Sequence, residues 1–426
     1  MTALVIGLAV SGRAAVDLLK SQGERVIGYD ADPKAAAGVA ADEVRTGSWE
    51  GSLLAGVDLV VTSPGVPESS RPLRDVLASG VTLWSELELG MRSLGGIPMA
   101  AVTGTNGKTT VTELTTSMLR FSGVDAVSAG NIGEPVALLA AAGHQALIVE
   151  ASSFQLRFID TFSPDAAAIV NFAPDHLDWH VDVAAYGAAK ARIFENMAAE
   201  SPLVFDADDA GAVGLVAASG TRRIGVSGSR RSEASGRDGD ELWLGGASVP
   251  LEELPRRDPV MLVDIAVAAE LAGVLGATES GIAEAALGYL PGRHRREVVA
   301  AADGVTWIDD SKATNPHAAL AAIESYPSVV LIAGGRAKGL DVRPLAEADS
   351  VRELVAIGES APDLLGERPD GFGAGSMADA VDRAMTIARP GDVVLLAPGC
   401  ASFDMFDSYG HRGDEFAAAV RARVGT

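Results

Sequence analysis

The sequence of 426 residues has a single cysteine, Cys400. One cysteine excludes an internal disulfide and is typical of a reducing compartment, so we expect a cytoplasmic protein. A lone cysteine that follows an apolar run is typical of packing, and we assign Cys400 no nucleophilic role.

Basic residues are also scarce, with 34 Lys and Arg against 57 Asp and Glu and a net charge of −23. Proteins that hold nucleic acid need dense Lys and Arg surfaces, so this balance argues against a nucleic-acid partner. The same charge opposes self-association, and we expect a monomer. Anionic substrates can bind only where a few basic groups and backbone N–H donors converge.

Long apolar runs are absent, although 48% of the residues are hydrophobic. No run approaches the roughly 20 uninterrupted apolar residues that span a bilayer. The opening MTALVIGLAVSGRAA is apolar but has no basic region and runs into a glycine turn. We therefore expect a first buried strand rather than a signal peptide. The length allows two or three domains.

Short β-branched runs alternate with helical patterns, which predicts an α/β protein with parallel sheets. We place three domains at residues 1–92, 93–290 and 291–426, the last beginning at Pro291-Gly292. The predicted strands lie at 3–7, 24–30, 57–65, 98–104, 146–150, 166–172, 305–310, 328–335, 354–360 and 392–399. Within the second domain, residues 238–251 predict a hairpin and the Ser/Gly-rich residues 227–240 an exposed loop.

The stretch TGTNGKTT (103–110) follows an apolar run and precedes a helical pattern. A strict phosphate loop reads G-x-x-x-x-G-K-[ST], and Val102 stands at its first glycine. The other parts are present, because Gly107 lets the backbone turn and Lys108 can neutralise phosphate charge. The hydroxyl of Thr109 suits Mg²⁺. The stretch predicts an ATP site.

Glu150 ends the predicted strand ALIVE, and binding sites of α/β sheets gather at such ends. Its carboxylate is either a Mg²⁺ ligand or the N-cap of the following helix.

Two histidines and two aspartates follow in NFAPDHLDWH (171–180). The helix predicted over AAYGAAKARIFENM (184–197) then places Lys190 on an apolar face with Tyr186, Ile193, Phe194 and Met197. A desolvated lysine favours the neutral amine, which can act chemically or react with CO₂ to give a carbamate that ligates metal. A snorkelling stem at the edge of the core fits the spacing equally well.

Eight stretches together resemble, in order, the motifs of the Mur ligases, ATP-dependent amide-forming enzymes that build the peptidoglycan precursor. They are TGTNGKTT, EASSFQL (150–156), NFAPDHLDWH, YGAAK (186–190), LPGRHRREVV (290–299), DDSKATNPHA (309–318), GGRAKG (334–339) and APGCASFDMF (397–406). The resemblance implies a Rossmann-like N-terminal domain for a UDP-linked substrate, a P-loop ATPase-like central domain, and a Rossmann-like C-terminal domain for glutamate. The GLAVSG, SKATN and CASFDMF stretches resemble the branch that adds D-glutamate to UDP-N-acetylmuramoyl-L-alanine during cell wall synthesis.

The resemblance also implies roles for individual residues. ATP is held by Gly104, Thr105, Asn106, Gly107, Lys108, Thr109 and Thr110. Thr109 and Glu150 bind one Mg²⁺, and His176 and a carbamylated Lys190 bind a second. The catalytic residues are Lys108, His176 and Lys190. The nucleotide side of the third domain carries Arg295, Asp310 and Lys312, and glutamate is received by Thr314, Lys338, Ser402, Phe403 and Tyr409. The UDP-linked substrate meets Val10, Ser11, Asp30, Ser63, Pro64, Gly65 and Asn131.

Two features leave alternatives open. GLAVSG (7–12) is nearly the G-x-G-x-x-G of dinucleotide-binding proteins, with Ala9 at the middle glycine, so a nicotinamide-dependent oxidoreductase is one alternative. Near residue 260, the His-Asn…Asn pattern of the family is replaced by Val260-Met261-Leu262-Val263-Asp264, so the usual contacts to adenine are in doubt. A nucleotide-binding regulator that has lost catalysis is therefore a second alternative. A related amide ligase for L-glutamate, another muramoyl peptide or folate is the third.

Overall fold

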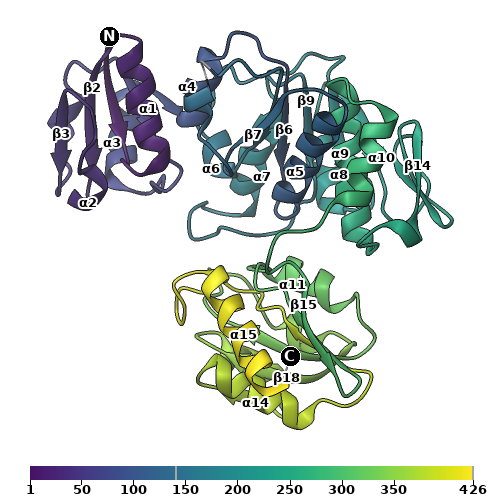
Figure 1. Cartoon of the computed structure of the whole chain (residues 1–426). Coiled ribbons are helices and arrows are strands. Elements are labelled where there is room, and N and C mark those ends of the chain that lie inside the picture. The colour runs from purple at the N-terminus through teal and green to yellow at the C-terminus, as the bar shows by residue number, and fades with distance from the viewer. Residues whose placement is uncertain (140–141, 425–426) are drawn as a thin grey trace. The chain divides into compact units, whose positions relative to one another are not determined.

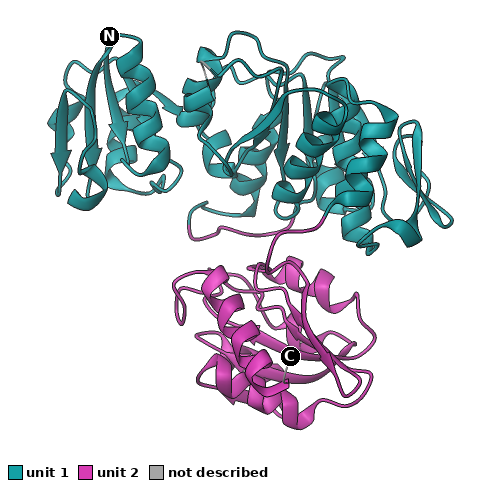
Figure 2. Cartoon of the chain, viewed as in Figure 1, with its two compact units in different colours: residues 1–172, 179–289 teal, residues 173–178, 290–426 magenta. Residues whose placement is uncertain are grey.

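The computed structural model describes residues 1–139 and 142–424. The chain forms two compact units (Figure 2): unit 1 holds residues 1–172 and 179–289, and unit 2 holds residues 173–178 and 290–426. The segment 173–178 thus belongs to unit 2, although the chain on both sides of it belongs to unit 1. The three-domain division at residues 92 and 290 stays a prediction.

The N-terminal part of unit 1 is a parallel sheet of order β3-β2-β1-β4-β5 with helices on it (Figure 1). Its strands are β1 (Thr2–Ile6), β2 (Arg25–Asp30), β3 (Glu43–Thr46), β4 (Leu59–Thr62) and β5 (Thr82–Ser85). Its helices are α1 (Val10–Ser21), α2 (Pro33–Ala36), η1 (Gly51–Leu54), α3 (Arg71–Ser79) and α4 (Glu86–Ser93). The strand order reverses between β1 and β4, and ligands of open α/β sheets bind at such a switch point.

The rest of unit 1 is built on a second parallel sheet, of order β11-β10-β9-β6-β8-β7. Its strands are β6 (Met99–Thr103), β7 (Ala126–Gly130), β8 (Ala146–Glu150), β9 (Ala166–Ile169), β10 (Pro202–Asp206) and β11 (Arg222–Val226). Beside it lie α5 (Lys108–Phe121), η2 (Val136–Leu139), α6 (Ser153–Leu156), α7 (Val183–Ala191), η3 (Arg192–Phe194) and α8 (Ala210–Val216). Every residue of β6, β8 and β9 is buried, as expected of central parallel strands covered on both faces.

A small antiparallel sheet follows, made of β12 (Gly236–Asp238), β13 (Glu241–Leu244) and β14 (Ala247–Pro250). It confirms the predicted hairpin. The predicted exposed loop 227–240 is wrong in part, because it contains β12 and the buried residues Ser227 and Ser235. The elements that complete unit 1 are η4 (Leu251–Glu253), α9 (Pro259–Val274) and α10 (Glu279–Gly288).

Unit 2 has one sheet of order β15-β16-β20-β17-β18-β19, parallel except for the β15–β16 pair. Its strands are β15 (Glu297–Ala302), β16 (Val305–Asp309), β17 (Val329–Gly334), β18 (Val351–Ile357), β19 (Phe372–Ala374) and β20 (Val393–Leu396). Its helices are α11 (Pro316–Ile323), α12 (Pro344–Glu347), α13 (Ala361–Glu367), α14 (Met377–Ile387) and α15 (Tyr409–Val424). No helix among the described residues is long and apolar enough to cross a membrane.

Glu88 of α4 fastens the two parts of unit 1 together. Its carboxylate is fully buried and accepts hydrogen bonds from the backbone N–H groups of Asp160, Thr161 and Phe162. It also accepts from the Thr161 hydroxyl and from Arg92 Nε. Burial works to raise the pKa of Glu88, but these donors outweigh it and hold the pKa below its usual value of 4.5.

Glu88→Gln is therefore expected to lower the free energy of unfolding at pH 7 by about 2–3 kcal/mol, the size of hydrogen bonds to a charged group. The depressed pKa makes the stabilisation complete above pH 4.5 and lost as the pH falls through the lower pKa of the folded state. Urea titrations of both proteins at pH 7 and pH 3.5 measure this. A difference that stays constant or grows at the lower pH would contradict the assignment.

Candidate active site

The predicted phosphate loop connects β6 to α5. Gly104 and Gly107 have positive φ values of 159° and 79°, and Gly107 is the N-cap of α5. Val102, where a strict phosphate loop has glycine, lies inside β6 and pairs with Glu150 and Ala168 on the neighbouring strands. The turn therefore begins after Val102, and no glycine is needed there. The loop leaves the backbone N–H groups at the start of α5 to attract an anion.

Asn171 holds this loop in shape, a role that sequence analysis missed. The backbone N–H of Asn106 donates to Asn171 Oδ1 at 2.8 Å, and that of Thr105 donates to the Asn171 carbonyl at 3.1 Å. In return, Asn171 Nδ2 donates to the Asn106 carbonyl at 3.2 Å. The one signal in the sequence is that Asn171 follows shortly after a central strand, β9.

Glu150 lies at the carboxyl end of β8 and is 2% exposed. Its Oε1 accepts from Asn131 Nδ2 at 2.7 Å, while its buried Oε2 has no hydrogen-bond partner among the described residues. The N-cap alternative is wrong, because Ser152 caps α6 in a capping box with Gln155. A buried carboxylate oxygen without a donor fits an oxygen ligand for Mg²⁺.

Lys190 reaches the same loop from α7. It is 1% exposed, and its Nζ donates to the Gly104 carbonyl at 2.6 Å and lies 3.4 Å from Thr103 Oγ1. The snorkelling alternative is therefore wrong. The predicted helix over residues 184–197 is also wrong in length, because α7 ends at Ala191 and η3 follows it.

Lys108 meets Lys190 at a common acceptor. Lys108 Nζ donates to the carbonyl of Gly104 at 2.8 Å and to that of Thr105 at 3.0 Å. The side-chain nitrogens of two lysines thus converge on the Gly104 oxygen, which concentrates positive charge beside the loop and suits an anionic ligand.

Asp264, in the stretch near residue 260 that differs from the family pattern, lies against the loop as well. Asp264 of α9 is 3% exposed, and a Cβ added at Gly107 would lie 2.6 Å from Asp264 Oδ1. Val260 is 38% exposed and Met261 is buried. The chain thus places one carboxylate, and not the amide of the family pattern, beside Gly107.

The histidines of NFAPDHLDWH have different surroundings. His180 is buried, with its Nε2 2.9 Å from Ser153 Oγ and its ring stacked on Phe154. In unit 2, His176 has a φ of 54° and a partly exposed side chain. His180 is thus packed in unit 1, whereas the side chain of His176 keeps part of its surface exposed in unit 2.

Asp175, beside His176, is a buried carboxylate with three donors in unit 2. They are Lys338 Nζ at 2.6 Å, the His176 backbone N–H at 2.7 Å and Asn315 Nδ2 at 2.9 Å. Burial works to raise the pKa of Asp175, but the charges of His176 and Lys338 outweigh it and lower the pKa. Lys338, predicted to receive glutamate, is paired with Asp175 in this structure.

Of the other predicted residues of unit 2, Arg295 lies before β15, and the rest follow β16 or β20, which are parallel neighbours. Asp310 Oδ1 accepts from the Arg296 backbone N–H, and Lys312 Nζ lies 3.4 Å from the Tyr409 hydroxyl. Arg295 and Thr314 are half-buried, Ser402 is buried, and Phe403 is 66% exposed. The structure thus brings Lys312 and Tyr409 together.

A further cluster in unit 2 joins His294, Glu297 and Asp309, whose ligand atoms all lie within 4.8 Å of one another. His294 Nδ1 lies 2.7 Å from Asp309 Oδ2, and Gly413 packs against both. Burial raises the pKa of Asp309. In this structure His294 and Asp309 form a hydrogen-bonded pair, with Glu297 accepting from the His294 backbone N–H.

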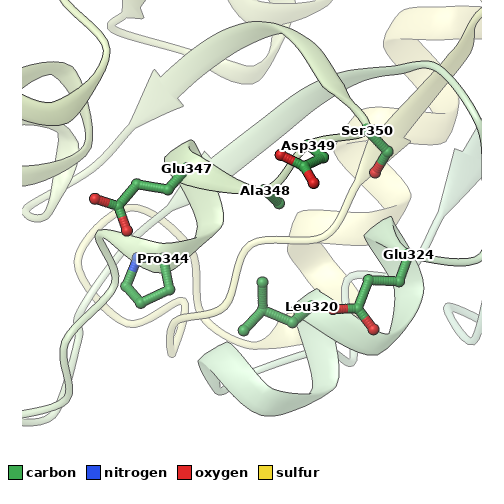
Figure 3. Close-up of a pocket in the computed structure, with 7 residues that line it drawn as sticks. All are labelled: Leu320, Glu324, Pro344, Glu347, Ala348, Asp349 and Ser350. Carbon is green, nitrogen blue, oxygen red and sulfur yellow. The ribbon is translucent and has the colours of Figure 1, made fainter.

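Figure 3 shows a pocket of about 440 Å³ in unit 2, lined by Leu320, Glu324, Pro344, Glu347, Ala348, Asp349 and Ser350. It lies where β18 begins, whereas most of the predicted ligand residues of unit 2 follow the carboxyl ends of β16, β17 and β20. None of the predicted site residues lines it.

In the N-terminal sheet, the GLAVSG turn follows β1 at the switch point. Gly7 has a φ of 86°, and its carbonyl accepts from Ser63 Oγ at 2.7 Å. Asp30 Oδ2 accepts from the Leu8 backbone N–H at 2.7 Å. Val10 begins α1 and is 71% exposed, while Ser11, Pro64 and Gly65 are partly or fully exposed nearby. The structure therefore gathers these predicted residues at one end of one sheet, whereas Asn131, also predicted to meet the UDP-linked substrate, follows β7 in the second sheet.

Three parallel or mostly parallel sheets with helices packed on them place this protein in the α/β class, and one of the sheets leads into the predicted phosphate loop. The chain belongs to the Mur ligase family: the Mur ligase middle domain matches residues 102–237, the glutamate ligase domain of Mur ligases matches 294–400, and the MurD-like N-terminal domain matches 1–85. Among solved structures, it is similar to UDP-N-acetylmuramate-alanine ligase from Thermotoga maritima, with a TM-score of 0.59, 16% identity and 99% of both chains covered.

Comparison with curated relatives shows which kind of Mur ligase the sequence is similar to. The chain is 43% identical to UDP-N-acetylmuramoylalanine–D-glutamate ligase of Frankia casuarinae, over 99% of this chain and 94% of that protein. It is 40% identical to the enzyme of the same name from Myxococcus xanthus, over 98% of each chain. The likeness to the solved Thermotoga maritima structure confirms the predicted fold class, a three-domain α/β protein, while the bounds of the domains stay a prediction.

Proposed function

We propose that this protein is an ATP-dependent ligase that joins D-glutamate to UDP-N-acetylmuramoyl-L-alanine in peptidoglycan precursor synthesis. The observation that carries the proposal is the full-length likeness to ligases of that name, at 43% and 40% identity. Family membership also sets aside the oxidoreductase interpretation of GLAVSG. The arrangement around the loop supports ATP as the co-substrate.

The chemistry needs an activated carboxylate, because a free carboxylate would have to expel an oxide. Attack of the alanine carboxylate on the γ-phosphorus of ATP forms an acyl phosphate and releases ADP. The amine of glutamate then attacks the acyl carbon, loses a proton, and expels phosphate, which leaves an amide. Such phosphoryl transfer depends mostly on positioning and charge.

The residues of the loop supply that positioning. The N–H groups at the start of α5 face the phosphates of ATP. When ATP binds, Lys108 Nζ donates to a phosphate oxygen in place of the Gly104 carbonyl. Asn171 keeps the backbone of Thr105 and Asn106 in place. Thr109 and Glu150 would hold Mg²⁺, whose charge would offset that of the transferring group.

Lys190 is proposed to act as a carbamate. Its ammonium group loses one proton, and the neutral amine then adds to CO₂ and loses a second proton. These steps turn a cation into an anion that could ligate a second Mg²⁺. The convergence on Gly104 supports this proposal, because two ammonium groups on one carbonyl repel each other and a carbamate would remove that repulsion.

The two glutamate enantiomers test the function directly. With ATP, Mg²⁺ and UDP-N-acetylmuramoyl-L-alanine present, we expect D-glutamate to support phosphate release. With L-glutamate the rate of phosphate release should be lower by about 100-fold or more, because its groups cannot meet a chiral site in the same way. Reactions without the UDP substrate are the control. Equal rates with both enantiomers, or release with a folate substrate in place of the UDP substrate, would assign the protein to another amide ligase.

A further inference from the structure

Arg412 of α15 is one of the largest fully buried side chains of the protein, at 1% exposure. Arginine is almost never buried to this extent unless it is paired. Sequence analysis assigned it no role, and the reaction described above does not use it. Its burial therefore needs a reason.

The guanidinium of Arg412 joins two loops. Nε donates to Ser311 Oγ at 2.9 Å and Nη2 to the Ser311 carbonyl at 2.8 Å. Nη1 donates to the Cys400 carbonyl at 3.0 Å. The Ser311 hydroxyl in turn donates to the Tyr409 carbonyl at 2.8 Å, which extends the network to the start of α15.

These loops carry the predicted amino-acid ligands. Ser311 lies in SKATN after β16, next to Lys312 and before Thr314, and Cys400 lies in CASF after β20, before Ser402. Because β16 and β20 are parallel neighbours, both loops leave the same edge of the sheet. Arg412 is thus bound directly beside both sets of ligands.

The choice of an arginine is informative because the three acceptors that hold it are neutral. Burial lowers its pKa to about 10, so it remains protonated at neutral pH, and this desolvation opposes folding. An apolar side chain would fill the space without that penalty. What arginine adds is a rigid fork whose donors fix the spacing of acceptors on separate segments.

We propose that Arg412 is a positioning residue of the glutamate subsite, holding the SKATN and CASF loops at the spacing that lets Thr314 and Ser402 bind the amino acid together. It does not touch the substrate. This inference rests on the proposed function, since it assumes that these loops receive glutamate.

Arg412→Met tests the inference by the split between kinetic constants. The KM for D-glutamate is expected to rise by about 10–100-fold, as for lost hydrogen bonds from a charged group, while the KM for ATP changes by less than about threefold. Ser311→Ala removes only the hydroxyl, and a smaller rise of the same constant is expected. If Arg412→Met does not fold, the KM of Ser311→Ala for D-glutamate tests the inference instead.

Arg368→Met is the matched control. Arg368 also donates to two backbone carbonyls in unit 2, those of Ala346 and Arg352, but it holds no predicted ligand loop. Its substitution should lower the melting temperature and leave the KM for glutamate unchanged. If Arg412→Met and Ser311→Ala also leave that KM unchanged, Arg412 is structural only and the inference is wrong.

A partial reaction separates this inference from the function. Without glutamate, hydroxylamine should trap the acyl phosphate as a hydroxamate, and Arg412→Met should form it at the rate of the wild type. If the wild type forms no hydroxamate, the proposed function fails and the inference fails with it. If hydroxamate formation falls in Arg412→Met as much as glutamate ligation does, the defect is not in the glutamate subsite.

Discussion

Lys190→Ala should lower the rate of phosphate release by about 10³-fold or more, the scale on which loss of a charge-stabilising group acts in phosphoryl transfer. The substitution removes the group that would carry the carbamate and leaves a cavity beside the loop, because the side chain is 1% exposed and ends 2.6 Å from the Gly104 carbonyl. Acetate or formate can enter that cavity and supply a carboxylate. Partial recovery of phosphate release with either anion is the expected result.

Two further measurements make this prediction specific. Wild-type protein equilibrated with ¹³C-labelled CO₂ should give a carbamate carbon resonance that Lys190→Ala lacks. Lys34→Ala, which changes an exposed lysine of α2, should keep both the resonance and the activity. A wild type that works equally well without CO₂, together with a variant that no carboxylate rescues, would mean that Lys190 acts as an amine.

The central strands could be predicted from the sequence because parallel strands buried on both faces are continuous apolar runs. β6, β8 and β17 are of this kind, and every residue in them is buried. The strands that were missed lie mostly at sheet edges, where this signal fails. β3 reads EVRT and β11 begins with two arginines, and both stand at the end of their sheet.

The same distinction applies to the candidate site. Lys108 and Glu150 could be predicted because each directly follows a recognisable strand or loop in the chain. Asn171, Asp175 and Arg412 have their roles through partners 65, 163 and 101 residues away, respectively, so the local sequence does not show what they bind, even though Asn171 and Asp175 lie in the NFAPDHLDWH stretch. For Asp264, the sequence showed a departure from the family but not that its carboxylate lies against Gly107.

Glu150→Gln is expected to weaken the binding of a divalent ion by about 100-fold and to lower kcat by a similar factor. The substitution keeps the shape of the side chain and an oxygen that can accept from Asn131, so the fold around β8 should be preserved. What it removes is the negative charge next to the loop, where Oε2 has no hydrogen-bond partner among the described residues. Electron paramagnetic resonance of Mn²⁺ in the presence of an ATP analogue measures the affinity apart from turnover.

The control for Glu150→Gln is Glu113→Gln on α5. Glu113 is exposed and accepts from the Tyr289 hydroxyl at 2.8 Å, so the same change of charge there should leave Mn²⁺ affinity and kcat within about twofold, as is usual for surface positions. If both variants weakened Mn²⁺ equally, the effect would come from net charge and not from coordination. If Glu150→Gln bound Mn²⁺ like the wild type but lost turnover, Glu150 would act by holding Asn131 toward the UDP-linked substrate instead.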